Sequence, residues 1–252
     1  MIDGLSAWDL VLVAAVTVQG TVLAYLPDPR WKALVLTLPI PFTLGTLSLG
    51  TPVDATNVVG LVLLLGYTLG VYGLHTRLRV PNVVSIGACA LGYCGLGALL
   101  ADGLPRSNAG FWATAGVVFI LGIVLHRLMP AREEPGYRSP LPVPVKAVMI
   151  AAVVTFLVVI KHQLQGFMTV FPMVGVVASY EGRHCLWTLA RQIPVLMIAL
   201  LPMMAAIRIL QPAFGVGWAL AAGWVVFLSV LIPLTRRQWA RGPLAHHAPG
   251  SV

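Results

Sequence analysis

The chain has 252 residues, of which 58% are hydrophobic and only 10% are charged, and its mean hydropathy is +0.90. About 25% of the residues of a soluble globular domain are charged. The composition therefore excludes an ordinary soluble domain and predicts an all-α, polytopic transmembrane helix bundle. The formal net charge of +8 does not indicate nucleic-acid binding, because the basic residues lie between apolar runs, where the positive-inside rule places them.

Apolar runs bounded by charged residues, Pro and Gly predict nine membrane spans, since a span needs roughly 20 mainly apolar residues. We expect them at 8–26, 33–50, 56–75, 81–101, 111–129, 146–160, 166–189, 192–211 and 214–234. The N-terminal stretch MIDGLSAWDL has no Lys or Arg ahead of its apolar run. We therefore expect a retained first helix and not a cleaved signal peptide.

The charges between these spans predict the orientation of the chain. Thirteen of the 16 Lys and Arg residues, Lys32 and Lys146 among them, flank the spans on one side, and only Arg106, Lys161 and Arg208 lie on the other. Cytoplasmic loops are enriched in Lys and Arg. The division therefore predicts an N-terminus outside and a C-terminus in the cytoplasm.

Short similarities predict an internal duplication. In order along the chain, WKAL (31–34) matches VKAV (145–148), VVG (58–60) matches MVG (173–175), RVP (79–81) matches QIP (192–194), and GFWATAGVVF (110–119) matches VGWALAAGWVVF (216–227). Four helices per repeat would keep both copies in the same orientation. The predicted organisation is an N-terminal helix (1–28), a first repeat (29–129), a cytoplasmic Pro-rich linker (130–145), a second repeat (146–235) and a cytoplasmic tail (236–252).

The predicted span 166–189 contains Glu181, a carboxylate within hydrocarbon. An ionisable side chain there costs at least about 2.5–3.5 kcal/mol, so it faces a cavity or pairs with another group. In a continuous helix Glu181 and His184 share a face, a workable proton relay. The candidate transport or relay residues are Glu181, His184, Tyr180, Arg183 and Pro172. The alternative is a structural ion pair of Glu181 with Arg183 or with an arginine of another helix.

Other candidate sites are weaker. Lys161 and His162 precede this helix, and Asp54 lies in the corresponding turn of the first half, so together they are candidates for an outer vestibule, with solvated loop charges as the alternative. The three cysteines lack metal-ligand spacing, and motifs such as HExxH and GxSxG do not occur in the sequence. We therefore expect no metal, no cofactor and no enzyme activity.

Prolines inside the predicted spans remove backbone hydrogen bonds and bend or break helices. They lie at positions 39, 41, 172, 202 and 233. Broken helices often line the substrate sites of transporters, whereas a kink that improves packing is the alternative. Small residues spaced four apart, as in Gly66-Tyr-Thr-Leu-Gly70, favour close helix contacts within the bundle and, as a second possibility, a homodimer face.

A set of residues in the second half carries a family resemblance: Lys146 at the start of a helix, the step from Gly166 to Phe171-Pro172, Ala178-x-Tyr180, and the charges of Glu181 and Arg183. On these residues, 145–210 resembles the GlpM-like family of small bacterial inner-membrane proteins, which are four-helix chains. The resemblance implies a multi-pass location in the bacterial inner membrane and an association with exopolysaccharide (alginate) production. Small multidrug-resistance transporters resemble the chain only in architecture, because their first-helix glutamate has no counterpart here.

Two functions follow as hypotheses. The first is a permease or exporter for a small molecule or ion, with a path between the two repeats. The second is a non-transporting membrane subunit or assembly factor linked to envelope exopolysaccharide production. The expected partners are the lipid bilayer and either a second copy or another membrane protein.

Overall fold

The computed structural model describes residues 6–105, 107–136, 142–159, 164 and 166–241. Every regular element in these ranges is a helix, which confirms the all-α prediction. The helices are α1 (Ala7–Tyr25), α2 (Pro29–Thr37), α3 (Ile40–Leu49), α4 (Ala55–Tyr72), the π-helix η1 (Gly73–Arg77), α5 (Asn82–Ala101), α6 (Asn108–Leu128), α7 (Val143–Val159), α9 (Gly166–Val170), α10 (Met173–Glu181) and α11 (Leu186–Arg241).

Six helical stretches in the described residues are long and apolar enough to cross a membrane, and two shorter ones are apolar as well. The chain is therefore a multi-pass membrane protein by helix length and composition.

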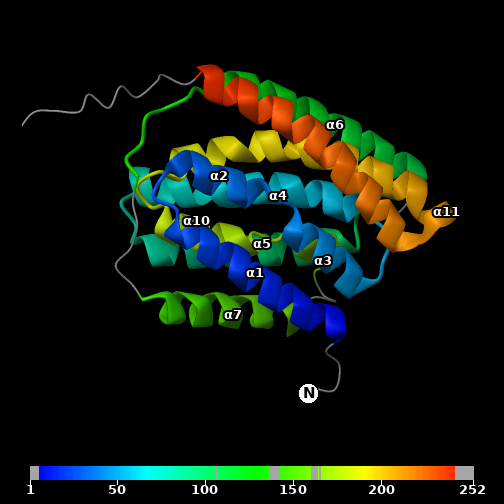
Figure 1. Cartoon of the computed structure of the whole chain (residues 1–252), viewed down its shortest axis with the longest axis horizontal. Helices are drawn as coiled ribbons and strands as arrows, with labels where there is room; N and C mark the ends of the chain where they lie inside the picture. The colour runs from blue at the N-terminus through cyan, green and yellow to red at the C-terminus, as the bar shows by residue number, and fades with distance from the viewer. Residues whose placement is uncertain (1–5, 106, 137–141, 160–163, 165, 242–252) are drawn as a thin grey trace, which may run out of the picture.

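The longest stretch, α11, is interrupted at Gly215, whose φ of 75° and ψ of 169° are not helical. A Cβ on Gly223 would lie 2.9 Å from Ile207 Cγ1 and 3.1 Å from Met203 Cγ, so the two parts of α11 fold back on each other as a hairpin (Figure 1).

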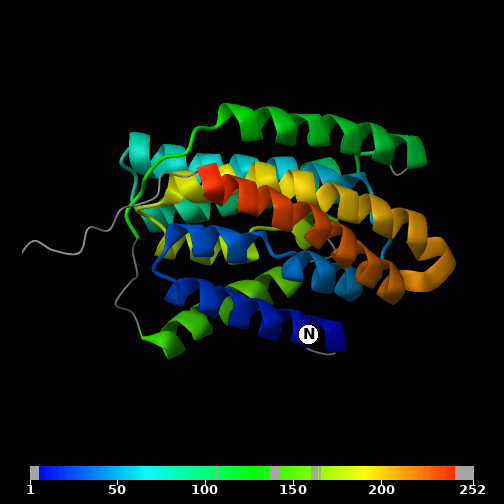
Figure 2. The same ribbon diagram turned by 45° about the horizontal axis from the view of Figure 1, so that its top comes forward.

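The helices run roughly side by side in a bundle (Figure 1). α1 packs against α3 and α7, α4 against α5, α6 and α9, and α11 against α2, α4 and α6. Figure 2 shows α7 crossing α1 at one side of the bundle. The first part of α11 lies in the core, where Ile193, Met197 and Met203 are completely buried.

Two of the predicted spans are interrupted near the middle. The span predicted at 33–50 consists of α2 and α3, separated at Leu38 and Pro39, and the span predicted at 166–189 breaks between α9 and α10 at Phe171 and Pro172. Proline lacks a backbone N–H and its ring clashes with the preceding turn. The predicted broken helices are therefore present at two of the proline sites.

Several predicted boundaries were wrong. The span 166–189 ends at Glu181, a turn covers 182–184, and α11 begins at Leu186, not at residue 192. α11 also continues to Arg241, so the first residues of the predicted tail are helical, and α7 begins at Val143, inside the predicted linker. The remainder of the predicted tail, 242–252, lies outside the described residues.

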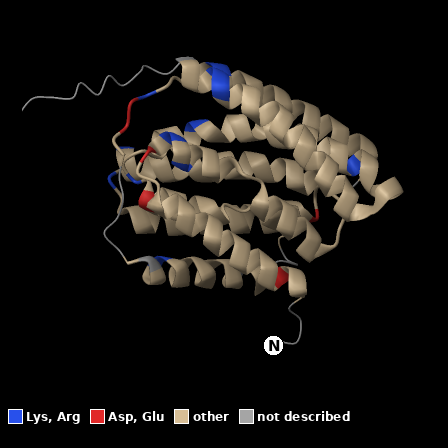
Figure 3. Ribbon diagram, in the orientation of Figure 1, with Lys and Arg blue, Asp and Glu red and all other residues tan. Residues whose placement is uncertain are grey.

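Most Lys and Arg residues gather at the end of the bundle where α2 and α7 begin (Figure 3). Arg208 lies away from this group, where its Nη1 donates to Val53 O at 2.5 Å, next to the start of α4. Among the described Lys and Arg residues, the division between the two ends follows the sequence prediction, whereas Arg106, Arg138 and Lys161 lie outside the described residues. We call the Lys- and Arg-rich end the basic end.

Glu134, in the predicted linker, caps α11. Its Oε1 accepts from Trp187 N at 3.2 Å and its Oε2 from Thr188 N at 2.6 Å. These N–H groups have no acceptor within their own helix, and a carboxylate is favourable at a helix N-terminus. The Arg132 guanidinium lies 4.1 Å from the centre of the Trp187 ring. This part of the linker is therefore fixed to the bundle.

We expect Glu134→Ala to lower the free energy of unfolding by about 1–2 kcal/mol, the usual range for loss of a helix cap. Glu133→Ala removes the same charge from an exposed neighbour and is the matched control. Chemical unfolding in detergent micelles measures both variants. Equal stabilities of the two variants would contradict the capping role.

Candidate functional site

Three charged side chains meet inside the bundle near the basic end. Glu181 Oε1 pairs with Lys146 Nζ at 3.0 Å, and Lys32 Nζ donates to the backbone carbonyl of Glu181 at 2.9 Å. The exposed fractions are 1% for Glu181, 7% for Lys146 and 0% for Lys32. We call these three residues the buried charge cluster.

Each member is positioned by a helix end. Lys32 lies in the first turn of α2, which Asp28 caps through Arg30 N at 2.8 Å. Lys146 lies in the first turn of α7, and Glu181 is the last residue of α10. The cluster therefore connects the first turns of α2 and α7 with the last residue of α10.

The electrostatics of the cluster explain how it tolerates burial. Unpaired buried charges are strongly disfavoured, whereas pairing with further hydrogen bonds offsets much of that cost. The carbonyl that Lys32 contacts is at the C-terminus of α10, the negative end of the helix dipole. Two ammonium groups and one carboxylate leave the cluster with a formal charge of +1.

The sequence identified only one member of this cluster as a site residue. Lys32 and Lys146 were predicted as charges flanking the spans, but both are buried and contact Glu181. A signal was present, because they occupy equivalent positions of the WKAL and VKAV segments. A lysine at the same place in two similar segments is a reason to expect a role inside the bundle, which a single flanking charge does not give.

The predicted face shared by Glu181 and His184 does not exist, because α10 ends at Glu181. His184 lies in the following turn and is exposed, and Arg183 beside it is partly buried. A Cβ on Gly182 would lie 2.7 Å from Ala178 O and 2.7 Å from Leu189 Cδ1. This glycine therefore permits the tight end of the helix that separates Glu181 from His184.

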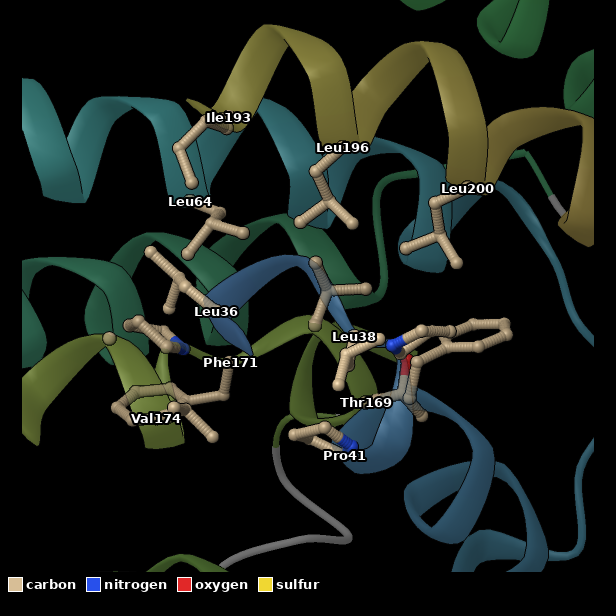
Figure 4. A pocket seen from close by; sticks show the side chains of 15 residues that line it. Leu36, Leu38, Pro41, Leu64, Thr169, Phe171, Val174, Ile193, Leu196 and Leu200 are labelled. Carbon is tan, nitrogen blue, oxygen red and sulfur yellow. The ribbon is translucent and has the colours of Figure 1, made fainter. Parts of the chain in front are cut away.

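The interruptions of the two broken helices surround a cavity of about 50 Å³ in the centre of the bundle. Figure 4 shows side chains from α2, α4, α11 and the α9–α10 break around it. Its labelled lining residues are Leu36, Leu38, Pro41, Leu64, Thr169, Phe171, Val174, Ile193, Leu196 and Leu200. Pro172, a sequence-predicted site residue, lines this cavity too.

Buried polar side chains satisfy the backbone groups that the interruptions release. Gln19 Nε2 on α1 donates to Val35 O at 2.8 Å and to Leu38 O at 3.3 Å, at the end of α2. Tyr93 OH donates to Phe167 O at 2.9 Å. Asn57 Nδ2 donates to the side-chain hydroxyl of Thr169 at 2.8 Å and so ties α9 to α4 beside the break. Helix breaks at membrane depth are stable only with such partners.

The two ends of α10 connect these features. Gly175, in its first turn, lines the central cavity, and Glu181, at its end, belongs to the buried charge cluster. Six residues of α-helix span about 9 Å. A displacement of this short helix would therefore change the cavity and the cluster together.

The predicted outer vestibule stays a prediction, because Asp54 is the one described residue among its three members. Lys161 and His162 lie outside the described residues. Asp54 caps α4 by accepting from Thr56 N at 2.9 Å and from Thr56 Oγ1 at 2.5 Å. Among the described residues, no group of three or more His, Cys, Asp and Glu side chains is placed to hold a metal ion.

Comparisons of the chain with protein-family models, curated proteins and solved structures found no match. The resemblance to the GlpM-like family stays a prediction, and the site is interpreted from its own geometry.

Proposed function

We propose that the protein is a permease or exporter for a small molecule or ion. The observation that carries this proposal is the pair of interrupted helices, α2–α3 and α9–α10, which meet at a cavity in the centre of the bundle. Transporters commonly bind substrate near the bilayer midplane, at sites formed by interrupted helices. The path would run between the two predicted repeats.

In this proposal the buried charge cluster closes the basic end of the path. Glu181 holds α7 through Lys146, and its carbonyl holds α2 through Lys32. A proton or a substrate cation that neutralises the carboxylate would weaken the hold on α7. α10, bounded by Pro172 and Gly182, would then be able to move and open the central cavity.

The membrane arrangement belongs to the same proposal. We propose nine passes, counting the two parts of α11 separately, with the basic end in the cytoplasm as the positive-inside rule requires. The location would be the bacterial inner membrane, which the GlpM-like resemblance implies. Lys32 and Lys146, equivalent in the predicted duplication, would serve one carboxylate from both halves.

The test is flux through purified protein reconstituted in liposomes that contain a pH-sensitive dye, with a panel of labelled small ions and sugars supplied outside. We expect substrate-dependent flux that is lost in Glu181→Gln and retained in His184→Gln, which places the same amide at an exposed neighbour. Size-exclusion chromatography and circular dichroism check that both variants are folded. Full flux in folded Glu181→Gln would overturn the proposed role of the carboxylate.

The burial of the charge cluster favours a second function, because Glu181 is only 1% exposed. The protein would then be a non-transporting membrane subunit or assembly factor, with an envelope exopolysaccharide system as the implied setting. Stable copurification with another membrane protein, together with absence of flux and of any thermal shift across the panel, would favour this function over transport.

A further inference from the structure

A short segment after α6 lies across the basic end of the bundle (Figure 1). We call this segment, residues 130–136, the strap. The indole Nε1 of Trp187, in the first turn of α11, donates to Pro130 O at 2.9 Å. Arg132 Nη1 donates to Tyr72 OH at 3.0 Å, at the last residue of α4. The start of the strap is therefore attached to two helices.

The rest of the strap extends to the start of α2. Glu134 caps α11 through two backbone N–H groups. A Cβ on Gly136 would lie 2.5 Å from Pro27 O, so the strap also contacts the loop between α1 and α2. Lys32, a member of the buried charge cluster, lies in the first turn of the helix that follows this loop. The strap thus connects α11 and the α1–α2 loop at the end of the bundle where the cluster lies.

The Cys185 thiol lies between the strap and the cluster. It is completely buried, and its Sγ would lie 3.2 Å from a Cβ on Gly182, the residue after Glu181. On its other side, Cys185 immediately precedes the turn of α11 that Glu134 caps. Burial raises the pKa of the Cys185 thiol to about 11, and the charges of Lys32 and Glu134 act on this pKa in opposite directions.

We infer that the strap is a lid over the buried charge cluster, and that its release opens the basic end of the bundle to solvent. Most residues of the strap are exposed, so it buries little apolar surface and depends on a few polar contacts. Segments of this kind open locally while the rest of the protein stays folded. The strap is therefore able to open without separation of the helices beneath it.

The lid acts on access to the cluster whether or not the protein transports a solute. If the protein is a permease, the cluster closes the path at this end, and an open strap would raise flux. This effect on flux rests on the proposed function, whereas access to the cluster does not.

The rate at which Cys185 reacts with a maleimide tests the inference. Cys89→Ala and Cys94→Ala leave Cys185 as the only cysteine of the full-length chain. This parent is treated in detergent micelles with a sulfonated maleimide, and mass spectrometry follows the adduct. A buried thiol reacts through the open state, so the rate reports the open fraction.

Glu134→Ala in this parent is expected to label about 5- to 30-fold faster, the change in an equilibrium constant that loss of a helix cap produces. Glu133→Ala removes the same charge from an exposed neighbour and is expected to label at the parent rate. Asp54→Ala removes the cap of α4 at the opposite end of the bundle, so it controls for a general loss of stability. It is also expected to label at the parent rate.

Gly136→Ala releases the other end of the strap and leaves the cap of α11 in place. Its new methyl group would overlap Pro27 O, so this variant is also expected to label faster than the parent. It keeps the inference testable if Glu134→Ala does not fold.

Two results would overturn the inference. One is labelling at the parent rate in every folded strap variant, which would show that the strap does not control access to Cys185. The other is labelling of Asp54→Ala as fast as that of the strap variants, which would show that the thiol is reached by unfolding of the bundle. Neither result bears on the flux assay, and absence of flux would leave the labelling result intact, so the two proposals fail separately.

Discussion

Lys146→Met is expected to lower the free energy of unfolding by about 3–5 kcal/mol, the cost of removing one partner of a buried ion pair. Lys146 and Glu181 are 7% and 1% exposed, and their charged atoms lie 3.0 Å apart. The variant leaves the Glu181 carboxylate buried without the Lys146 ammonium. Methionine keeps most of the apolar length of the side chain, so lost packing contributes little.

Chemical unfolding in detergent micelles measures this change, and Arg237→Met, the same substitution of a cation at an exposed site, is its control. The double variant Lys146→Met/Glu181→Gln removes both charges but keeps the carbonyl that binds Lys32. Because replacing a whole buried ion pair is often nearly neutral, we expect the double variant to be more stable than Lys146→Met alone. Additive losses would show that the two side chains do not act as a pair.

Gly166→Ala is the second substitution with a large expected effect, about 3 kcal/mol of destabilisation, at the upper end for overpacking. A Cβ at this position would lie 2.0 Å from Thr56 Oγ1 and 2.9 Å from Asn57 N. Thr56 and Asn57 belong to the capped first turn of α4, which is not free to move away. The new methyl group therefore pushes α9 away from α4 and disturbs the α9–α10 break.

Gly66→Ala is the matched control for this substitution, because a Cβ on Gly66 has no atom within 4 Å. Alanine in a helix interior is favoured over glycine by about 0.5–1 kcal/mol, so this variant is expected to be as stable as the parent or more stable. Thermal unfolding in micelles compares the two. A Gly166→Ala protein as stable as Gly66→Ala would contradict the close contact between α9 and α4.

The small-residue motif shows why spacing alone predicts contacts incompletely. Gly66 and Gly70 form a GxxxG, yet only Gly70 is close to a neighbour, with Cys89 Sγ 2.9 Å from the position of its Cβ. Gly166 and Gly223 lie outside this GxxxG pair, yet Gly166 closely approaches α4 and Gly223 closely approaches the first part of α11. Four-residue spacing places two residues on one face of a helix, but the face that meets a neighbour is decided by the whole bundle.

The helix boundaries illustrate a similar limit. Charges and prolines predicted the ends of α1, α5 and α6 to within a few residues, because these helices are uninterrupted apolar runs with polar flanks. They did not predict that α10 ends at Glu181, although the next residue, Gly182, is of a type that often ends a helix, because single glycines also occur inside apolar spans. The close packing of Gly182 and Leu189 is a tertiary effect.

By itself the sequence determined the membrane class, the all-α architecture, the segregation of the described basic residues and the need of Glu181 for a partner, because each follows from the cost of placing polar groups in hydrocarbon. Only the tertiary structure decided the partners of Glu181. Lys32 is 149 residues away along the chain, and a lysine at the end of an apolar run has the same local sequence whether it extends to the interface or enters the bundle. Which of these two positions the lysine takes depends on the helices that pack beside it, and only the tertiary structure shows which helices these are.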